Sequence, residues 1–141
     1  MRILALALAL AAFSVAATAD QLTTLTVKVE NVSIRGGKLH VGVYDAESFT
    51  AGAFNPVLSK VTNANPGTMV VTFIGIAPGT YAVKVVQDVN ANSVQDKRFL
   101  GQTSEPIGYS NAVTHNGQPS FQEAKFAVTE GDNKIVIRLH E

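Results

Sequence analysis

Apolar and polar residues alternate one by one along much of the chain, and this period of two restricts the fold more than any other feature. Residues 24–30 carry an apolar side chain at every second position, and residues 39–44 repeat the pattern. Such alternation is typical of a β-strand with one buried and one solvated face. Gly36-Gly37, between the two segments, indicates a tight turn. The pattern predicts two strands joined as a hairpin.

Further strands follow the same rule. They are rich in β-branched and aromatic residues and are predicted at residues 57–61, 68–74, 81–86, 121–128 and 134–139. The segment 68–74 is apolar enough to be buried on both faces. Pro78-Gly79 and residues 130–133 have the composition of turns. We therefore expect a second hairpin around Pro78-Gly79 and a third around residues 130–133.

No segment keeps a helical period over three turns. Residues 45–49 could open a short helical turn, but breakers at 51–53 and 55–56 favour a loop. Many short strands between turns are typical of two packed sheets. We therefore predict an all-β fold, an antiparallel β-sandwich, with an open barrel as the alternative. One core is expected, formed largely by Leu25, Val27, Val29, Leu39, Val41, Val43, Phe73, Val83, Phe126, Ile135, Ile137 and Leu139.

Residues 1–19 have the composition of a signal peptide. Arg2 gives a positive start, residues 3–13 form an unbroken apolar run, and Ala17-Thr18-Ala19 matches the small-x-small cleavage pattern. The apolar run is shorter than the roughly 20 residues that a membrane-spanning helix needs. We therefore expect cleavage after Ala19 and a periplasmic or secreted protein of residues 20–141. It should fold as one domain without membrane insertion.

Composition excludes several function classes. The chain has 11 basic and 11 acidic residues, and loss of Arg2 with the signal peptide leaves a net charge of −1. Nucleic-acid binding would require a clustered basic surface. The absence of cysteine excludes thiol chemistry, disulfides and cysteine-ligated zinc. An envelope protein or a glycan remains as the expected partner.

One long loop, residues 88–120, interrupts the alternation and is rich in Asn, Asp, Ser, Gly and Pro. A connection of this length without secondary structure is uncommon in a compact domain and is usually functional or disordered. The function is therefore expected in this loop.

The start of this loop has the spacing of a calcium site. Side-chain oxygens at positions 1, 3, 5 and 9 and a backbone carbonyl at position 7 can surround Ca²⁺. The corresponding residues are Asp88, Asn90, Asn92, Asp96 and, for the carbonyl, Val94. Phe99 replaces the bidentate Glu and Ser93 replaces the turn glycine, so we expect weak binding of about 10⁻⁴–10⁻³ M. The alternative is a solvated loop of consecutive Asx turns.

Catalytic arrangements have little support in the sequence. Ser110 with His115 and a loop acid could form a triad, and Asp96 with Glu105 could form a carboxylate pair. No motif supports either arrangement. We therefore predict a non-catalytic binding or interaction module; the alternative is a small hydrolase or carbohydrate-acting enzyme with its site in residues 88–120.

The remaining candidate residues are one tyrosine and two histidines. Tyr109 could present an aromatic ring to a sugar or peptide, or pack the long loop onto the sandwich, and packing is favoured. His40 and His140 have no predicted metal-binding partner and are assigned to the surface.

Several stretches, taken in their order along the chain, resemble an uncharacterised family of exported bacterial proteins, domain of unknown function 2141. They are residues 71–83 with Pro78-Gly79-Thr80-Tyr81, residues 88–96, residues 105–111 and residues 119–126. The resemblance implies an immunoglobulin-like or transthyretin-like sandwich in the cell envelope, without an established activity. The family tends to carry His before the first loop Asp and Gly at the sixth loop position. Here Gln87 and Ser93 stand at these positions, which weakens a metal site carried over from the family.

Overall fold

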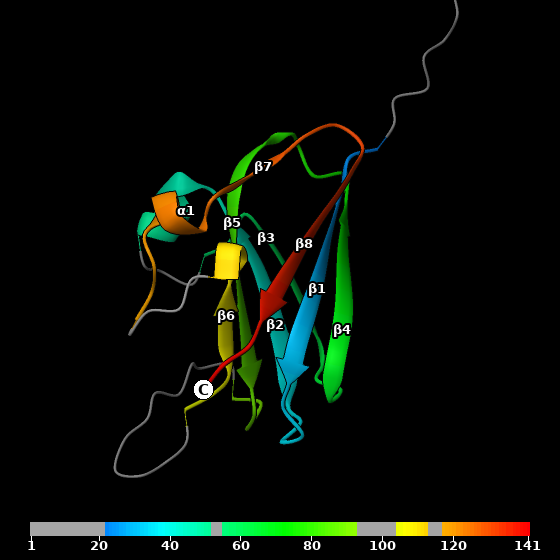
Figure 1. Ribbon diagram of the computed structural model, residues 1–141, viewed down its shortest axis with the longest axis vertical. Coiled ribbons are helices and arrows are strands. Elements are labelled where there is room, and N and C mark those ends of the chain that lie inside the picture. Colours follow the sequence, from blue (N-terminus) through cyan, green and yellow to red (C-terminus); the bar gives the residue numbers. More distant parts are fainter. Residues whose placement is uncertain (1–21, 52–54, 93–103, 113–116) are drawn as a thin grey trace, which may run out of the picture.

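Two β-sheets pack face to face in the computed structural model, which describes residues 22–51, 55–92, 104–112 and 117–141 (Figure 1). The first sheet contains, in spatial order, β4 (Gly67–Ile74), β1 (Thr24–Val32) and β8 (Asp132–Arg138). The second contains, in spatial order, β3 (Leu58–Asn63), β2 (Lys38–Tyr44), β5 (Gly79–Asp88) and β6 (Ile107–Tyr109), with β7 (Phe126–Val128) paired to the start of β5. Three short helices are α1 (Ala46–Thr50), the 3₁₀ helix η1 (Ser110–Ala112) and α2 (Phe121–Ala124). The predicted all-β sandwich is confirmed.

The core lies between the inner faces of the two sheets. From Leu25 to Val29 in β1 and from Leu39 to Val43 in β2, every second residue is buried there, as the alternation predicted. Beyond Val29 the register of β1 shifts, and Val32 is the next buried residue. The predicted core is confirmed except at Phe126 and Ile135, which are partly buried and pack against its edge. Both lie on strands at the margin of their sheets, so the opposing sheet covers them incompletely.

Burial of residues 68–74 on both faces is wrong. Val71 and Phe73 face the core, but Val70 and Ile74 are 61% and 69% exposed. The outer face of the first sheet lies away from the second sheet, so its apolar side chains contact solvent. Composition alone therefore overstated the burial of this strand.

All three predicted hairpins are wrong, because each pair of strands is divided between the two sheets. β1 and β2 lie in different sheets, and so do β4 and β5. β7 pairs with β5, whereas β8 pairs with β1. The predicted turns therefore lead from one sheet to the other. A turn reverses the chain, but it does not decide which strand becomes the hydrogen-bonded neighbour.

Two segments predicted as loop contain regular structure. Residues 45–49 begin α1, since Asp45 accepts a hydrogen bond from the Ser48 amide and Ser48 Oγ accepts one from the Asp45 amide. The predicted loop 88–120 contains β6 and η1. The reason is that residues 107–109 pair with β5, a contact between distant parts of the chain.

One side of the sandwich is closed and the other is open. On the closed side, Ile107 of β6 and His140, just after β8, exchange backbone hydrogen bonds of 2.9 and 3.0 Å. On the open side, β3 and β4 are edge strands, and no backbone pairing joins them in the part of the chain that the structure describes. β1 and β8 are parallel, unlike the other described strand pairs. Backbone hydrogen bonds thus connect the two sheets on one side only, a feature that the sandwich shares with the open-barrel alternative.

Among the described residues, no helix has the length and apolar character needed to cross a membrane.

Candidate functional site

Buried polar residues gather at the end of the sandwich where β5 finishes and the long segment begins. Gln87, Asp88 and Glu105 are 0%, 2% and 4% exposed. Burying polar groups costs free energy unless their hydrogen bonds are made within the protein. We name this cluster the loop base and define it as Arg35, His40, Gln87, Asp88 and Glu105.

Gln87 joins β5 to the segment between β1 and β2. Its Nε2 donates to the carbonyl oxygens of Ser33 and Gly36 at 3.0 and 2.8 Å, and its Oε1 accepts from the Ser33 amide at 2.8 Å. These bonds involve both the oxygen and the nitrogen of the side-chain amide. Gln87 therefore fixes the position of the turn after β1 relative to the end of β5.

Glu105 joins the two ends of the segment 89–104. Its Oε1 accepts a hydrogen bond from the Val89 amide at 3.0 Å. Two residues before Val89 and one residue after Glu105, the Gln87 backbone amide donates to the Pro106 carbonyl at 2.9 Å. The residues that enter and leave the segment are thus held together by a buried carboxylate and a backbone bond.

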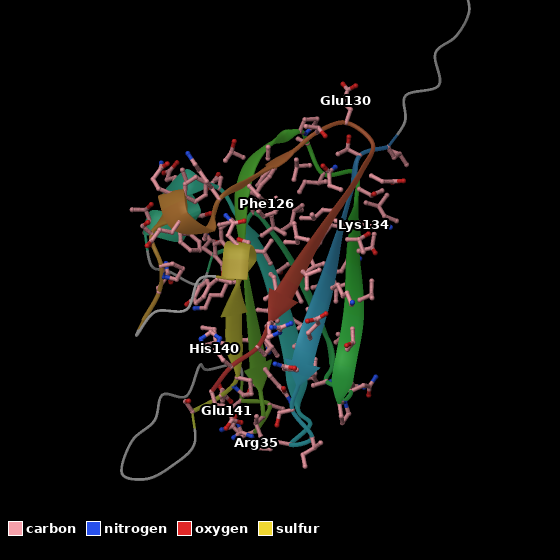
Figure 2. The ribbon with its side chains drawn as sticks, viewed as in Figure 1. Arg35, Phe126, Glu130, Lys134, His140 and Glu141 are labelled. Atoms are coloured by element: carbon pink, nitrogen blue, oxygen red, sulfur yellow. The ribbon has the colours of Figure 1, made fainter. Side chains whose placement is uncertain are left out.

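Arg35 attaches the C-terminus of the chain to the same region. It donates to the Ser104 carbonyl at 2.9 Å and to the Glu141 carboxylate at 2.6 Å. Figure 2 shows Arg35 and Glu141 close together, with His140 nearby, at this end of the molecule. The ion pair is partly exposed, so its contribution to stability should be small, about 0–1 kcal/mol. Its main effect is to position Ser104.

Asp88 and Asn90 form the overlapping turns that begin the segment. The Asn92 amide donates to Asp88 Oδ1 at 3.1 Å and to Asn90 Oδ1 at 3.2 Å. Ala91 takes a left-handed φ of 55° to allow this geometry. Asn90 therefore forms an Asx turn, and the Asp88 carboxylate accepts a hydrogen bond from the same amide, four residues further along the chain. Val94 and Asp96 lie outside the described residues.

His40 differs from its predicted surface position. Its side chain is mostly buried, and its Nε2 lies 3.5 Å from Asp88 Oδ2. The pairing of β2 with β5 places the two residues near one another on the outer face of the second sheet. Sequence alone could not reveal this contact, because it depends on which strand pairs with β2. The part of the chain that the structure describes holds no group of three or more metal-ligating His, Cys, Asp or Glu residues.

Ser110, the candidate nucleophile, is buried and bonded to backbone. Its Oγ donates to the Ala124 carbonyl and accepts from the Val83 amide at 3.0 Å. This serine therefore ties η1 and the end of α2 to β5. His115, the base proposed for it, and Asp96, one member of the proposed carboxylate pair, lie outside the described residues. In the carboxylate pair, Glu105 has the structural contact described above.

Tyr109 packs the long segment onto the sandwich, as favoured from the sequence. Its ring meets Phe49 edge to face at 6.3 Å, and Phe49 also contacts Tyr44 and Phe121. Burial, with a smaller contribution from Tyr44, raises the pKa of Tyr109 to about 12. The phenol is therefore protonated at neutral pH. The Tyr109 ring belongs to a second, smaller apolar cluster on the outer face of the second sheet.

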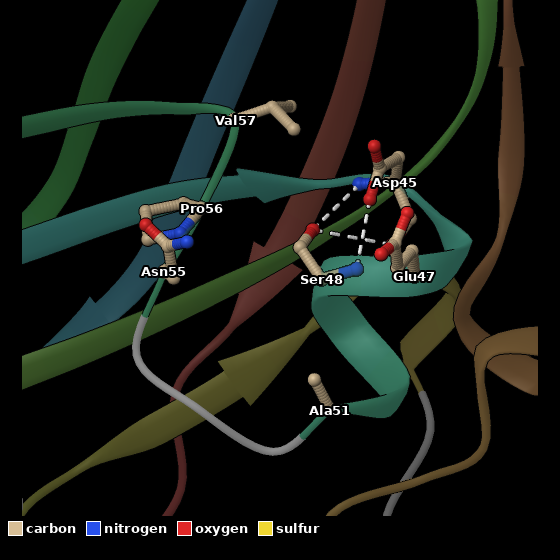
Figure 3. Close-up of a pocket in the computed structure, with 7 residues that line it drawn as sticks. All are labelled: Asp45, Glu47, Ser48, Ala51, Asn55, Pro56 and Val57. Carbon is tan, nitrogen blue, oxygen red and sulfur yellow. Dashed lines mark hydrogen bonds between the residues drawn. The ribbon is translucent and has the colours of Figure 1, made fainter.

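A pocket of about 360 Å³ lies beside α1 (Figure 3). Asp45 and Ser48 line it, and Figure 3 shows them hydrogen-bonded to each other at the start of the helix. The bonds from Ser48 hold the pKa of Asp45 below its usual value. Glu47 and Asn55 complete the polar part of the lining, and Ala51, Pro56 and Val57 form its apolar part. No nucleophile paired with a base lines this pocket among the described residues.

The two packed sheets place the chain in the class of all-β sandwich proteins. The loop base lies where the long segment begins. The chain belongs to the family described as uncharacterized protein conserved in bacteria (DUF2141), whose model matches residues 27–136. This match confirms the family resemblance found in the sequence. No curated protein and no solved structure matches the chain.

Proposed function

We propose that the mature protein is an exported, non-catalytic module of the cell envelope that binds a partner protein or glycan through residues 89–104. The observation that carries this proposal is the buried Glu105 carboxylate, which joins the Val89 amide to the far end of the segment. Binding loops on a rigid scaffold are a common arrangement in β-sandwiches. Fixing both ends in advance reduces the conformational entropy that binding must remove. Export rests on the features of residues 1–19.

The rival function is a small hydrolase or a carbohydrate-acting enzyme with its site in residues 88–120. It has less support, because the Ser110 hydroxyl bonds two backbone groups and the Tyr109 ring is packed against Phe49. A nucleophile must instead be reachable by a substrate and by a base.

A pull-down tests the binding function. Residues 20–141, immobilised, should retain a partner from envelope extract. A variant with residues 93–103 replaced by a Gly-Ser linker of equal length keeps the loop base and should melt like the parent, but should lose that partner. A Lys134→Ala variant, changed on the exposed face of β8, should retain it. Equal capture by the linker variant, or no partner retained by the parent, would contradict the proposal.

We propose further that the start of this segment binds calcium weakly through Asp88, Asn90, Asn92, Val94 and Asp96. The support is that the side-chain oxygens of Asp88 and Asn90 converge on one point, the Asn92 amide. Calcium prefers such oxygen donors, and the missing bidentate Glu limits the expected dissociation constant to about 10⁻⁴–10⁻³ M. Its role would be to order the segment rather than to take part in a reaction.

Isothermal titration tests this ion site. We expect Asp88→Asn, which keeps the shape and the hydrogen-bond acceptor but removes the charge, to weaken calcium binding on the order of tenfold. Asp132→Asn removes an exposed charge on β8 in the same conservative way and should bind like the parent. If the parent gives neither heat nor a melting shift in millimolar calcium, the Asx-turn alternative holds. Equal responses from all three proteins would place the ion elsewhere.

A further inference from the structure

The open side of the sandwich contains a groove unrelated to the loop base. It has a volume of about 320 Å³ and is lined by residues 60–62 of β3 and 69–72 of β4. Both strands are the edges of their sheets. We name this groove the edge seam.

Among the described residues, the edge of β4 that faces the seam has backbone groups without a partner, except the Thr72 carbonyl, which accepts a hydrogen bond from Lys60 Nζ. The Gly75 amide donates to the Thr23 carbonyl, which sets the alternation of hydrogen bonds along the antiparallel pair β1–β4. By this alternation Val71 and Phe73 bond to β1, whereas Val70, Thr72 and Ile74 direct their backbone groups away from it. β4 contains no charged residue and no proline, which commonly protect edge strands.

Lys60 supplies the positive charge in the seam. It pairs with Val41, whose side chain is in the core, so Lys60 lies on the inner face of β3. Its Nζ donates to the Thr72 carbonyl and lies 5.5 Å from the centre of the Phe73 ring. In the described parts of the chain, no carboxylate lies within ion-pair distance of it.

The positive charge of Lys60 favours a partner strand that carries a carboxylate over a second copy of this chain. Pairing of β4 with β4 of a second copy would bring two Lys60 ammonium groups to one interface, where like charges repel. A strand that carries a carboxylate would complement Lys60 instead. Val61 and Val70 are exposed beside the groove and offer apolar contacts to alternate side chains of such a strand.

We propose that the edge seam binds an extended segment of a partner protein by β-strand addition to β4, with an acidic side chain of that segment paired to Lys60. Backbone hydrogen bonds to Val70, to Ile74 and to the amide of Thr72 would hold the strand, and the charge of Lys60 would select its register. This site is independent of residues 89–104, and so is its test.

The probe is a nine-residue synthetic peptide of alternating Thr and Val with a central Glu, beside matched peptides with central Gln or Lys. Amide chemical shifts of the mature protein are followed during titration. The Glu peptide should shift the amides of Val70, Thr72 and Ile74 and bind on the order of tenfold tighter than the Gln peptide. Lys60→Glu should reverse the preference toward the Lys peptide. Lys60→Met, which keeps the aliphatic chain, should bind the Glu and Gln peptides equally.

Three results would overturn the proposal. The first is equal affinity of the parent for the Glu and Gln peptides. The second is a set of shifted amides that excludes β4. The third is self-association of the parent through β4 in sedimentation experiments, since a second copy would then occupy the seam.

Discussion

Replacing Phe73 with alanine should lower the free energy of unfolding by about 3–5 kcal/mol, the cost of removing a buried aromatic ring and leaving a cavity. Phe73 is 4% exposed and belongs to the core between the sheets. Its neighbours come from two sheets held by backbone pairing, so they cannot move far enough to fill the space. Urea denaturation of residues 20–141 measures the change.

Ile74 provides the matched control, because it is the next residue on β4 and is 69% exposed. Ile74→Ala should change the free energy of unfolding by less than about 0.5 kcal/mol. Phe126→Ala should fall between the two, since Phe126 is only partly buried. Equal denaturation midpoints for the Phe73 and Ile74 variants would show that the faces of β4 are wrongly assigned.

Most of the strands and of the core could be predicted from the sequence, because side-chain alternation is a local property. β6 was missed, and residues 121–124, predicted as strand, form α2. Leu25, Val27 and Val29 face one way whatever β1 pairs with. Strand partners could not be predicted in this way. β1 pairs with β4 and β8, and β8 begins over 100 residues after β1 begins. The turn residues predicted pairing between strands that are adjacent in sequence. At those turns, however, the chain crosses from one sheet to the other.

The start of the long segment could also be predicted, because Asp88, Asn90 and Asn92 are close in sequence and form local turns. Val94 and Asp96, which we propose as calcium ligands, fall outside the described residues, so the calcium site stays a prediction.

The rest of the loop base was missed. Gln87 bonds Ser33, 54 residues earlier, and Glu105 bonds Val89 only because the segment returns to β5. One signal was present in the sequence. Val83, Val85 and Gln87 occupy alternate, buried positions of β5, so the alternation itself placed a polar amide on the core face. A polar residue in such a position requires hydrogen-bonding partners and could have indicated a polar cluster at this end of the sheet.

The loop base also explains why Gly37 is glycine. It has a left-handed φ of +87°, and a Cβ built there would overlap the Asp88 carbonyl oxygen and lie 2.7 Å from Val89 Cα. Gly37→Ala should therefore lower the free energy of unfolding by about 2–5 kcal/mol, through backbone strain together with displacement of the residues that begin the segment.

Comparison of Gly37→Ala with Gly36→Ala shows whether the segment 89–104 starts from a tightly packed loop base. Gly36 has a similar φ of +73°, but nothing lies within 4 Å of a Cβ built there. Its variant should show only the strain, about 1–2 kcal/mol. The measurement is urea denaturation of both variants beside the parent. We expect a clearly larger loss of stability for Gly37→Ala than for Gly36→Ala, whereas equal losses would mean that residues 88 and 89 do not pack closely against Gly37.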